Sequence, residues 1–290
     1  MAYKKKKALQ KRHWFSNILI LVIFLAGVSI LCYPVVSDMV NQYQQNQVVS
    51  GYQEAVNQQS AEEIARMKQA AQLYNEDLLK DEIIVDPFDQ VQNKKAGIEY
   101  YQSLDPQKNG VMGMVRIPAI DVSLPIYHGT EEEVLQKAIG HLEQTSLPIG
   151  GAGTHAVISG HRGLPSAKLF TDLNLLKTGD VFYVDVLDET LAYKVDQIKT
   201  VEPHELEDLA IISGEDHVTL VTCTPYAINS HRLLVRGTRI PYEEAEEVQK
   251  QEEAAAQKDF LPYLAAGVAA LVLVILIILF MFCRKKAGRK

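Results

Sequence analysis

The sequence predicts a mainly β domain that stands outside a membrane between two transmembrane helices. Three observations support this prediction. From about Gly110 the chain contains short, β-prone apolar runs, two longer runs near its ends carry no charge, and basic residues flank both of these longer runs.

The two uncharged runs are candidate membrane spans. Residues 14–37 include ILILVIFLAGVSIL, and residues 260–283 read FLPYLAAGVAALVLVILIILFMFC. About 20 apolar residues cross a bilayer as a helix, so each run is long enough. The first run exceeds the core of a signal peptide and lacks a small-residue cleavage pattern after it, so we expect an uncleaved anchor.

The tails outside these runs are basic. Residues 1–13 contain six Lys and Arg, and residues 284–290 contain five. Short flanks rich in Lys and Arg stay in the cytoplasm. We therefore expect a two-pass protein of the cell membrane, with both termini in the cytoplasm and the segment from about Asp38 to Asp259 on the extracellular face.

With this topology, the net charge that matters for binding partners is that of the extracellular segment alone. Of 29 Lys and Arg, 18 remain in the extracellular segment, against all 36 Asp and Glu, which gives it a net charge of −18. Such a surface repels nucleic acid and favours neutral or basic partners. A nucleic-acid partner is therefore not expected.

Three connecting segments surround the β-rich region. Residues 38–80 are rich in Gln, Glu, Ala and Asn and predict a helical stalk of one or two helices between the membrane and the β-rich domain; the alternative is a solvated stalk with little tertiary contact. Residues 81–109 are a loop or extended lead-in, because Pro87 disfavours helical structure there. Residues 242–259 are acidic and Ala-rich, which predicts a helical spacer before the second span.

Residues 110–241 contain the predicted strands. Apolar runs rich in Val, Ile, Tyr and Thr alternate with turn residues, namely VMGMVRIP, VSLPIY, HAVISGH, VFYVDVL, LAYKVDQIKTV, HVTLVTCTP and HRLLVRGTRI. Seven or more strands in about 130 residues predict a closed barrel or a sandwich. The stretch EEEVLQKAI, Glu131 to Ile139, predicts a short helix between strands.

One cysteine is outside the predicted membrane spans. Cys32 and Cys283 lie within those spans, so Cys223 has no partner for an internal extracellular disulfide and cannot form a zinc cluster with other cysteines. No metal or cofactor is expected. Cys223 ends a β-prone run just before Thr224-Pro225, at a rim position where a thiol could react, although a free cysteine can also be a small buried apolar residue.

A reactive thiol needs a base or a positive neighbour. Seven extracellular histidines could serve, and His161 in ISGHRG is notable because it also ends an apolar run at a glycine. His155 and His161 lack a third zinc ligand. Arg232 opens the strand after Cys223, so a hairpin would return it to the thiol, where a guanidinium could stabilise an oxyanion. A surface arginine is the alternative.

The segments around these residues resemble the sortase family. TLVTC, Thr219 to Cys223, continues as TPYAINSHRLLVRG, and ISGHRG lies 62 residues before the cysteine at the family's histidine position. The resemblance covers about residues 81–241. It implies an eight-stranded β-barrel in which Cys223 is the nucleophile, His161 the acid and base, and Arg232 the residue that positions the substrate or stabilises an oxyanion.

Two features are similar to class C, the pilin-polymerising sortases. These proteins have a hydrophobic helix after the barrel, like residues 260–283, and a lid with Asp-Pro-aromatic, like Asp86, Pro87 and Phe88. The resemblance implies that Asp86 contacts the arginine and that Phe88 covers the thiol. Ala227, where Gly is frequent, and Phe88, where Trp is frequent, depart from the pattern without removing a catalytic group.

The implied activity is that of a cysteine transpeptidase. It would cleave an LPXTG-like sorting signal of a pilin or another surface protein through a thioacyl intermediate on Cys223, and transfer the acyl group to an amine. That amine would be a pilin lysine in pilus polymerisation. The alternatives are a wall-anchoring enzyme that uses a peptidoglycan precursor amine, a thiol protease, and a non-catalytic assembly scaffold.

Overall fold

The computed structural model describes residues 2–78, 86–89 and 97–251, with side chains described from residue 19 onwards. The chain divides into two compact units, Met1–Ile240 and Pro241–Lys290. In the second unit, residues 242–251 are helical. The predicted second membrane span, residues 260–283, and the basic tail, residues 284–290, lie outside the described residues.

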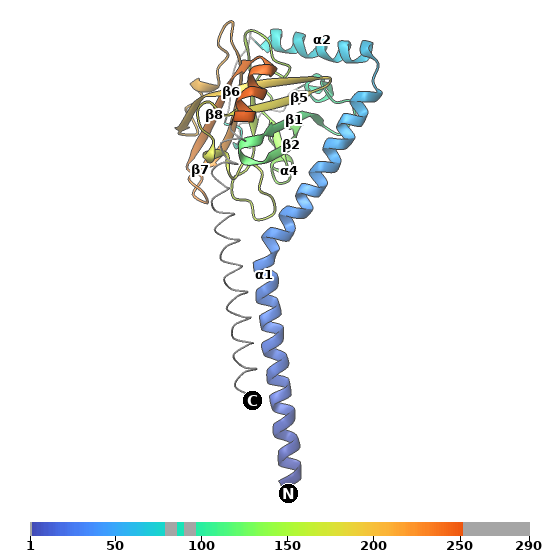
Figure 1. Cartoon of the computed structure of the whole chain (residues 1–290), viewed down its shortest axis with the longest axis vertical. Coiled ribbons are helices and arrows are strands. Elements are labelled where there is room, and N and C mark those ends of the chain that lie inside the picture. Colours follow the sequence, from blue (N-terminus) through green and yellow to red (C-terminus); the bar gives the residue numbers. More distant parts are fainter. Residues whose placement is uncertain (1, 79–85, 90–96, 252–290) are drawn as a thin grey trace, which may run out of the picture. The chain divides into compact units, whose positions relative to one another are not determined.

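The first unit contains an eight-stranded closed barrel with the strand order β1-β2-β3-β4-β7-β8-β6-β5 (Figure 1). Two neighbouring pairs, β2–β3 and β4–β7, are parallel, and the other pairs are antiparallel. The strands are β1 (Val111–Ile117), β2 (Val122–His128), β3 (Ile139–His141), β4 (Thr154–Ser159), β5 (Val181–Val186), β6 (Glu189–Val201), β7 (Asp216–Thr224) and β8 (His231–Ile240). The predicted barrel is confirmed.

Each of the seven predicted runs contains a strand, and the eighth strand was missed. β3 has only three residues, and its first residue, Ile139, was assigned to a helix. That helix, α4, is shorter than predicted and spans Glu132–Leu135. A three-residue strand is too short to show an alternation of apolar and polar residues. Its pairing with β2 and β4 becomes apparent only in the closed barrel.

The barrel has apolar side chains on both faces of β7. Val218 and Leu220 belong to the main core, which fills the barrel. Val221 belongs to a second apolar cluster with Val157 of β4 and Leu234 of β8. Because successive side chains of a strand point to opposite faces, this second cluster lies on the outer surface of the barrel.

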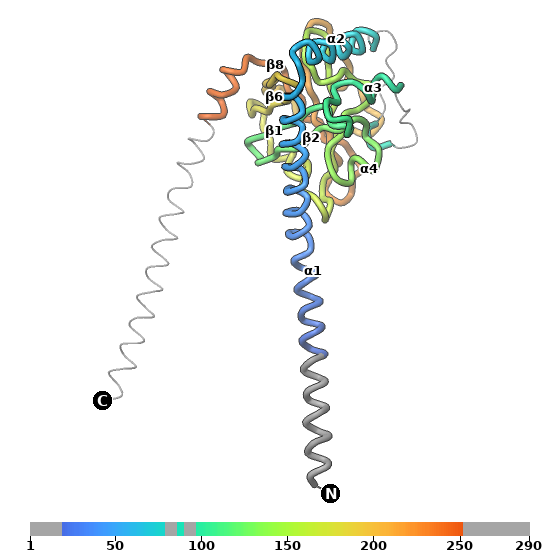
Figure 2. Tube along the Cα trace, turned by 90° about the vertical axis from the view of Figure 1, so that its right-hand side faces the viewer, coloured from blue at the N-terminus to red at the C-terminus, as the bar shows by residue number. Residues whose placement is uncertain are grey.

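Helix α1 (Ala2–Gln58) contains the first predicted span (Figure 2). Residues 19–36 are all exposed, although most of them are apolar. Among the described residues, this is the one helix long and apolar enough to cross a membrane. An apolar surface of this kind is unfavourable in water and suggests that the helix anchors the protein in a bilayer.

The end of α1 packs against β1 and β2, and α2 (Ala61–Leu78) adds Ala71 and the partly buried Ile64, Met67 and Tyr74 to the main core. The buried hydroxyl of Tyr52 donates a 2.9 Å hydrogen bond to the Met112 carbonyl and accepts one of 2.9 Å from the Leu187 amide. α2 begins with a capping box: Ser60 and Glu63 each accept a hydrogen bond from the other's backbone amide.

Two further contacts fix helices to the barrel. The buried side chain of Asn75 in α2 pairs with both backbone groups of Leu147, at 2.7 and 3.2 Å. In α3 (Ile98–Gln102), the buried Tyr100 hydroxyl lies 2.9 Å from Nδ1 of His141. Nε2 of His141 lies 2.8 Å from the Ser146 carbonyl, which only accepts, so Nε2 carries the proton and Nδ1 accepts from Tyr100.

The buried histidine predicts acid sensitivity. Burial lowers the pKa of His141 to about 3, whereas an unfolded histidine has a pKa of about 6.5. Below about pH 6.5 the unfolded state therefore binds a proton that the folded state does not, and stability falls as the pH decreases. The contribution of one such histidine approaches 1.4 kcal/mol per pH unit, about the maximum for one proton.

We expect His141→Gln to reduce the slope of unfolding free energy against pH between 6 and 4.5, measured by urea unfolding of the detergent-solubilised chain. His204→Gln, which removes an exposed histidine, serves as the control and should leave the slope unchanged. Equal slopes for His141→Gln and the parent would contradict the prediction.

Candidate active site

The parallel pairing of β4 with β7 defines the position of His161. Six residue pairs, from Thr154 with Asp216 to Ser159 with Val221, share an offset of 62 residues. Contacts with this offset continue past the strand end, because the Thr222 hydroxyl donates to the Gly160 carbonyl at 2.7 Å. His161 precedes Cys223 by the same 62 residues, so the two lie level at one end of the ladder.

The antiparallel hairpin of β7 and β8 brings Arg232 to the other side of the thiol. Cys223 and Arg232 are cross-strand partners, as expected from the sequence. Both are buried, with 6% and 9% of their surface exposed. The three residues that the sequence singled out thus come from three adjacent strands or strand ends, in the order His161, Cys223, Arg232.

Residues 86–89 lie over this row. The Asp86 carboxylate accepts two hydrogen bonds from Arg232, from Nε at 2.9 Å and from Nη2 at 2.5 Å. The Phe88 ring lies 5.6 Å from the His161 ring and 5.0 Å from the Arg232 guanidinium carbon. Phe88 also packs on the outer apolar cluster. The bidentate Asp86–Arg232 pair is a strong, directional contact that fixes this segment.

The local chain around His161 is tightly constrained. Its carbonyl accepts a 3.2 Å hydrogen bond from the Phe170 amide. A Cβ on Gly160 would approach both Ile139 and Phe170 to 2.8 Å, so this position requires glycine. Gly163 has φ of +80°, and a Cβ there would lie 2.7 Å from the Tyr226 ring. The glycines of ISGHRG are therefore explained by packing and backbone conformation.

Arg162, the residue after His161, connects the ends of two strands. Its guanidinium donates to the Thr224 hydroxyl at 3.1 Å, to the Thr171 carbonyl at 3.2 Å and to the Asn174 side chain at 2.7 Å. Thr224 follows Cys223, so this arginine fixes the segment that carries the histidine to the segment that carries the thiol. The sequence analysis missed this role, because an arginine beside a candidate residue has no distinctive pattern.

Burial dominates the protonation of the two reactive groups. It raises the pKa of the Cys223 thiol, as does the Asp86 charge, while Arg232 lowers it. Burial also lowers the pKa of His161, and Glu132 raises it. Near neutral pH this arrangement favours a thiol and a neutral imidazole over the ion pair.

Glu132 of α4 was not predicted as part of the site. Its Oε2 lies 4.0 Å from Nε2 of His161, and this buried nitrogen lacks a hydrogen-bond partner within the described part of the chain. The run EEEV indicated only a helix, because the distance between α4 and His161 depends on the barrel closing.

Four other histidines are buried in structural positions, namely His128, His141, His155 and His217. Within the described ranges, no group of three or more His, Cys, Asp or Glu side chains is placed to hold a metal ion.

The comparisons with known proteins agree with this geometry. The family model for the sortase domain matches residues 115–240. Sortase A of Staphylococcus aureus is 31% identical over 161 residues, which are 53% of this chain and 76% of that protein. The chain belongs to the sortase family. Sortase A of Bacillus anthracis and sortase A of Streptococcus agalactiae are covered over less of their length, 61% and 47%.

Solved sortases C are similar to about two thirds of the chain. Sortase C1 of Streptococcus agalactiae is 46% identical, with a TM-score of 0.62, covering 67% of this chain and 98% of that chain. A sortase C of Streptococcus pneumoniae, described in terms of pilin substrate specificity, is 48% identical, with a TM-score of 0.60 and 68% and 97% coverage. The sequence resemblance to the sortases is confirmed.

The contact with Glu132 predicts the direction in which the sortase histidine responds to a mutation. We expect Glu132→Gln to lower the pKa of His161 further, because the carboxylate stabilises the imidazolium. The measurement is an NMR titration of the imidazole. Glu133→Gln removes the same charge from the next residue and is the control; equal shifts in the two variants would mean that general surface charge, and not the contact, acts on His161.

Proposed function

We propose that the protein is a membrane-anchored cysteine transpeptidase that cleaves an LPXTG-like sorting signal and transfers the acyl group to an amine. The observation that carries this proposal is the level row of His161, Cys223 and Arg232, contributed by adjacent strand ends. Membership of the sortase family supports it.

In the first step, the Cys223 thiolate attacks the carbonyl carbon of the Thr–Gly bond in the signal. A carbon–sulfur bond forms, and Arg232 donates hydrogen bonds to the oxyanion that develops on the carbonyl oxygen. The carbon–nitrogen bond then breaks, and the His161 imidazolium gives its proton to the leaving amine. The product is a thioacyl enzyme.

In the second step, an acceptor amine attacks the thioester carbonyl. His161, now neutral, takes a proton from this amine as the new carbon–nitrogen bond forms. The carbon–sulfur bond breaks and Cys223 leaves as a thiolate. The enzyme returns to its starting protonation state, and the reaction needs no cofactor.

For the acceptor we favour a lysine of the next pilin subunit, which makes the reaction pilus polymerisation. The similarity to sortases C, one of them described in terms of pilin substrate specificity, supports this choice. Transfer to a peptidoglycan precursor amine, as in wall anchoring, and hydrolysis by a thiol protease are the alternatives. They share the first step and differ only in the nucleophile of the second.

Asp86 and Phe88 act as a lid in this proposal. While the lid is closed, Asp86 occupies the guanidinium that the oxyanion needs, and Phe88 contributes to the burial of the reactive residues. Opening removes a negative charge from Cys223 and an aromatic ring from His161. Both changes favour the thiolate–imidazolium pair, so opening the lid also activates the nucleophile.

The membrane topology completes the proposal. The exposed apolar part of α1 anchors the chain, and residues 260–283 form a second span. The basic tails remain in the cytoplasm, which places the catalytic domain on the extracellular face. There it meets surface proteins that carry sorting signals as they emerge at the membrane.

The mechanism predicts an acyl adduct on Cys223. The full chain in detergent, carrying Asp86→Ala, is incubated with an LPXTG-like peptide and analysed by mass spectrometry. We expect the adduct in this variant and none after Cys223→Ala. Because an oxyanion donor contributes roughly 100-fold or more, Arg232→Ala should slow adduct formation by at least about 100-fold.

Added amines separate the alternatives. A lysine-containing pilin peptide should yield an isopeptide-linked product, whereas a protease would release only free acid whichever amine is present. If no peptide forms an adduct even with Asp86 replaced, the transpeptidase proposal is wrong.

The lid predicts protection of the thiol. Asp86→Ala should raise the rate of alkylation of Cys223 by about tenfold, the effect of losing roughly 1.4 kcal/mol from a buried charged hydrogen-bond pair. Labelling is quantified at the peptide that contains Cys223. Asp89→Ala removes a carboxylate from the same segment but leaves the Asp86–Arg232 pair, so it is the control. An unchanged rate in Asp86→Ala would sink the lid hypothesis.

A further inference from the structure

The outer surface of the barrel carries three rows of side chains that share the face of Cys223. The first row contains Cys223 and its partner Arg232. In the second row, Val221 pairs with Leu234. In the third, Thr219 pairs with Arg236 and, across the β4–β7 ladder, with Val157. His155 and His217 pair with each other one row beyond Thr219 and point to the same face.

Thr219 and the two histidines are polar, yet all three are buried. His155 has no exposed surface, and Thr219 and His217 are each 1% exposed. Polar side chains on the outside of a barrel are normally solvated, so another segment must cover these. The covering segment is the connection between β6 and β7, residues 202–215, which includes the short helix η3 (Glu207–Leu209).

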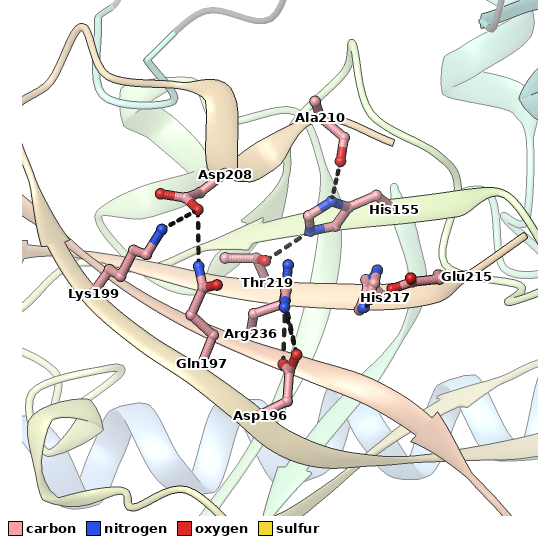
Figure 3. A network of polar contacts seen from close by, with 10 residues as sticks. All are labelled: His155, Asp196, Gln197, Lys199, Asp208, Ala210, Glu215, His217, Thr219 and Arg236. Carbon is pink, nitrogen blue, oxygen red and sulfur yellow. Dashed lines mark hydrogen bonds and ion pairs between the residues drawn. The ribbon is translucent and has the colours of Figure 1, made fainter. Parts of the chain in front are cut away.

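Polar contacts to Asp208 and to Ala210 fix this connection (Figure 3). His155 Nδ1 lies 2.9 Å from the Ala210 carbonyl, and the Thr219 hydroxyl lies 2.7 Å from His155 Nε2. The carbonyl can only accept, so Nδ1 donates and Nε2 accepts from Thr219. On the other side, the Asp208 carboxylate accepts from Gln197 at 3.0 Å and from Lys199 at 2.6 Å.

Burial keeps His155 neutral, and the nearby charges act on its pKa in opposite directions, because Arg236 lowers it and Asp196 raises it. Arg236 forms an ion pair with Asp196, at the point where β6 carries an extra residue. Burial lowers the pKa of His155 to about 4, so at neutral pH the imidazole keeps the proton arrangement that both contacts require.

Leu209 lies between the two fixed residues, Asp208 and Ala210. It is 1% exposed and belongs to the outer apolar cluster on which Phe88 packs, together with Leu206 of the same connection. We call Leu206 and Leu209 together the wall. Its position depends on the contacts that hold Asp208 and Ala210. Leu206 and Leu209 are thus part of the apolar surface on which Phe88 packs.

We propose that His155 is a positioning residue: it fixes residues 208–210 and thereby sets the groove wall, formed by Leu206 and Leu209, that binds the peptide substrate. This inference rests on the proposed function, because it assigns the wall to substrate binding. His155 touches neither the reacting atoms nor the thiol in this scheme, so its loss acts on KM.

The test uses the full chain in detergent, in the Asp86→Ala background, with three variants. His155→Phe removes both contacts, His155→Gln retains a donor and an acceptor, and Thr219→Val removes only the hydroxyl in case His155→Phe does not fold. His128→Phe is the matched control, because it replaces a buried histidine whose ring nitrogens contact the Gly110 and Ser103 carbonyls and not residues 202–215.

Two quantities are measured: hydrogen–deuterium exchange of residues 202–215, and the kinetics of adduct formation on Cys223 with an LPXTG-like peptide. For His155→Phe we expect exchange about tenfold faster and KM about tenfold higher, with kcat within twofold, as for the loss of one buried hydrogen bond. Thr219→Val should change both in the same direction, His155→Gln should recover most of the effect, and His128→Phe should leave both quantities unchanged.

Each alternative result has a definite meaning. Unchanged exchange would show that His155 does not fix the connection, and faster exchange with unchanged KM would show a purely structural role; either result overturns the inference. If the parent forms no adduct, the proposed function fails, while the exchange data still decide whether His155 holds the connection.

Discussion

The arrangement of the site depends on one constraint, the parallel register of β4 and β7. An offset of 62 residues brings the ends of two distant segments level, and this offset equals the separation of His161 and Cys223. A slip by one residue would turn one of the two side chains to the opposite face of the sheet, because the side-chain period of a strand is two.

The register is supported from both sides: Val157 and Val221 are buried on the outer face, Ile158 and Leu220 in the core, and Arg162 bonds to Thr224 past the end of the ladder. The hairpin between β7 and β8 places Arg232 opposite Cys223. This placement needs no contact between segments that are distant in the sequence.

Burial of this row has opposite effects on protection and reactivity. It shields the thiol, but it also raises the pKa of Cys223 and lowers that of His161, so the ion pair needed for attack is disfavoured. The proposed lid resolves this conflict, because the residues that bury the site also carry the charge that opposes the thiolate. Asp86 raises the pKa of Cys223, while Arg232 lowers it. If Asp86 moves away, Arg232 remains beside the thiol and stabilises the thiolate. In this proposal, one movement of the lid both exposes the Cys223 thiol and makes it more reactive.

The sequence predicted the barrel and the convergence of Cys223 with Arg232, because both follow from local patterns: alternating apolar runs and a hairpin between two of them. The glycine that ends the apolar run made His161 notable, but the choice of His161 over the other histidines rested on the resemblance; His155, six residues earlier, is buried. β3 was missed because three residues show no periodicity, and Glu132 because its distance to His161 exists only after the barrel closes. The packing of α1 and α2 was left open, as Tyr52 and Asn75 stabilise it through single side chains that bond to distant backbone groups.

The outer face of the barrel is covered by two segments that are held in chemically different ways. Residues 86–89 are held by an ion pair with Arg232, and a developing oxyanion on a substrate carbonyl can replace the Asp86 carboxylate at that guanidinium. The β6–β7 connection is held by Asp208, which bonds to Gln197 and Lys199 of β6, and by one hydrogen bond from neutral His155 to the Ala210 carbonyl. An incoming peptide cannot replace the histidine contact, because His155 is buried beneath the connection. Substrate can therefore compete with the first segment and not with the second. In the proposed mechanism, this difference lets residues 86–89 open while the β6–β7 connection remains as the wall against which the peptide binds.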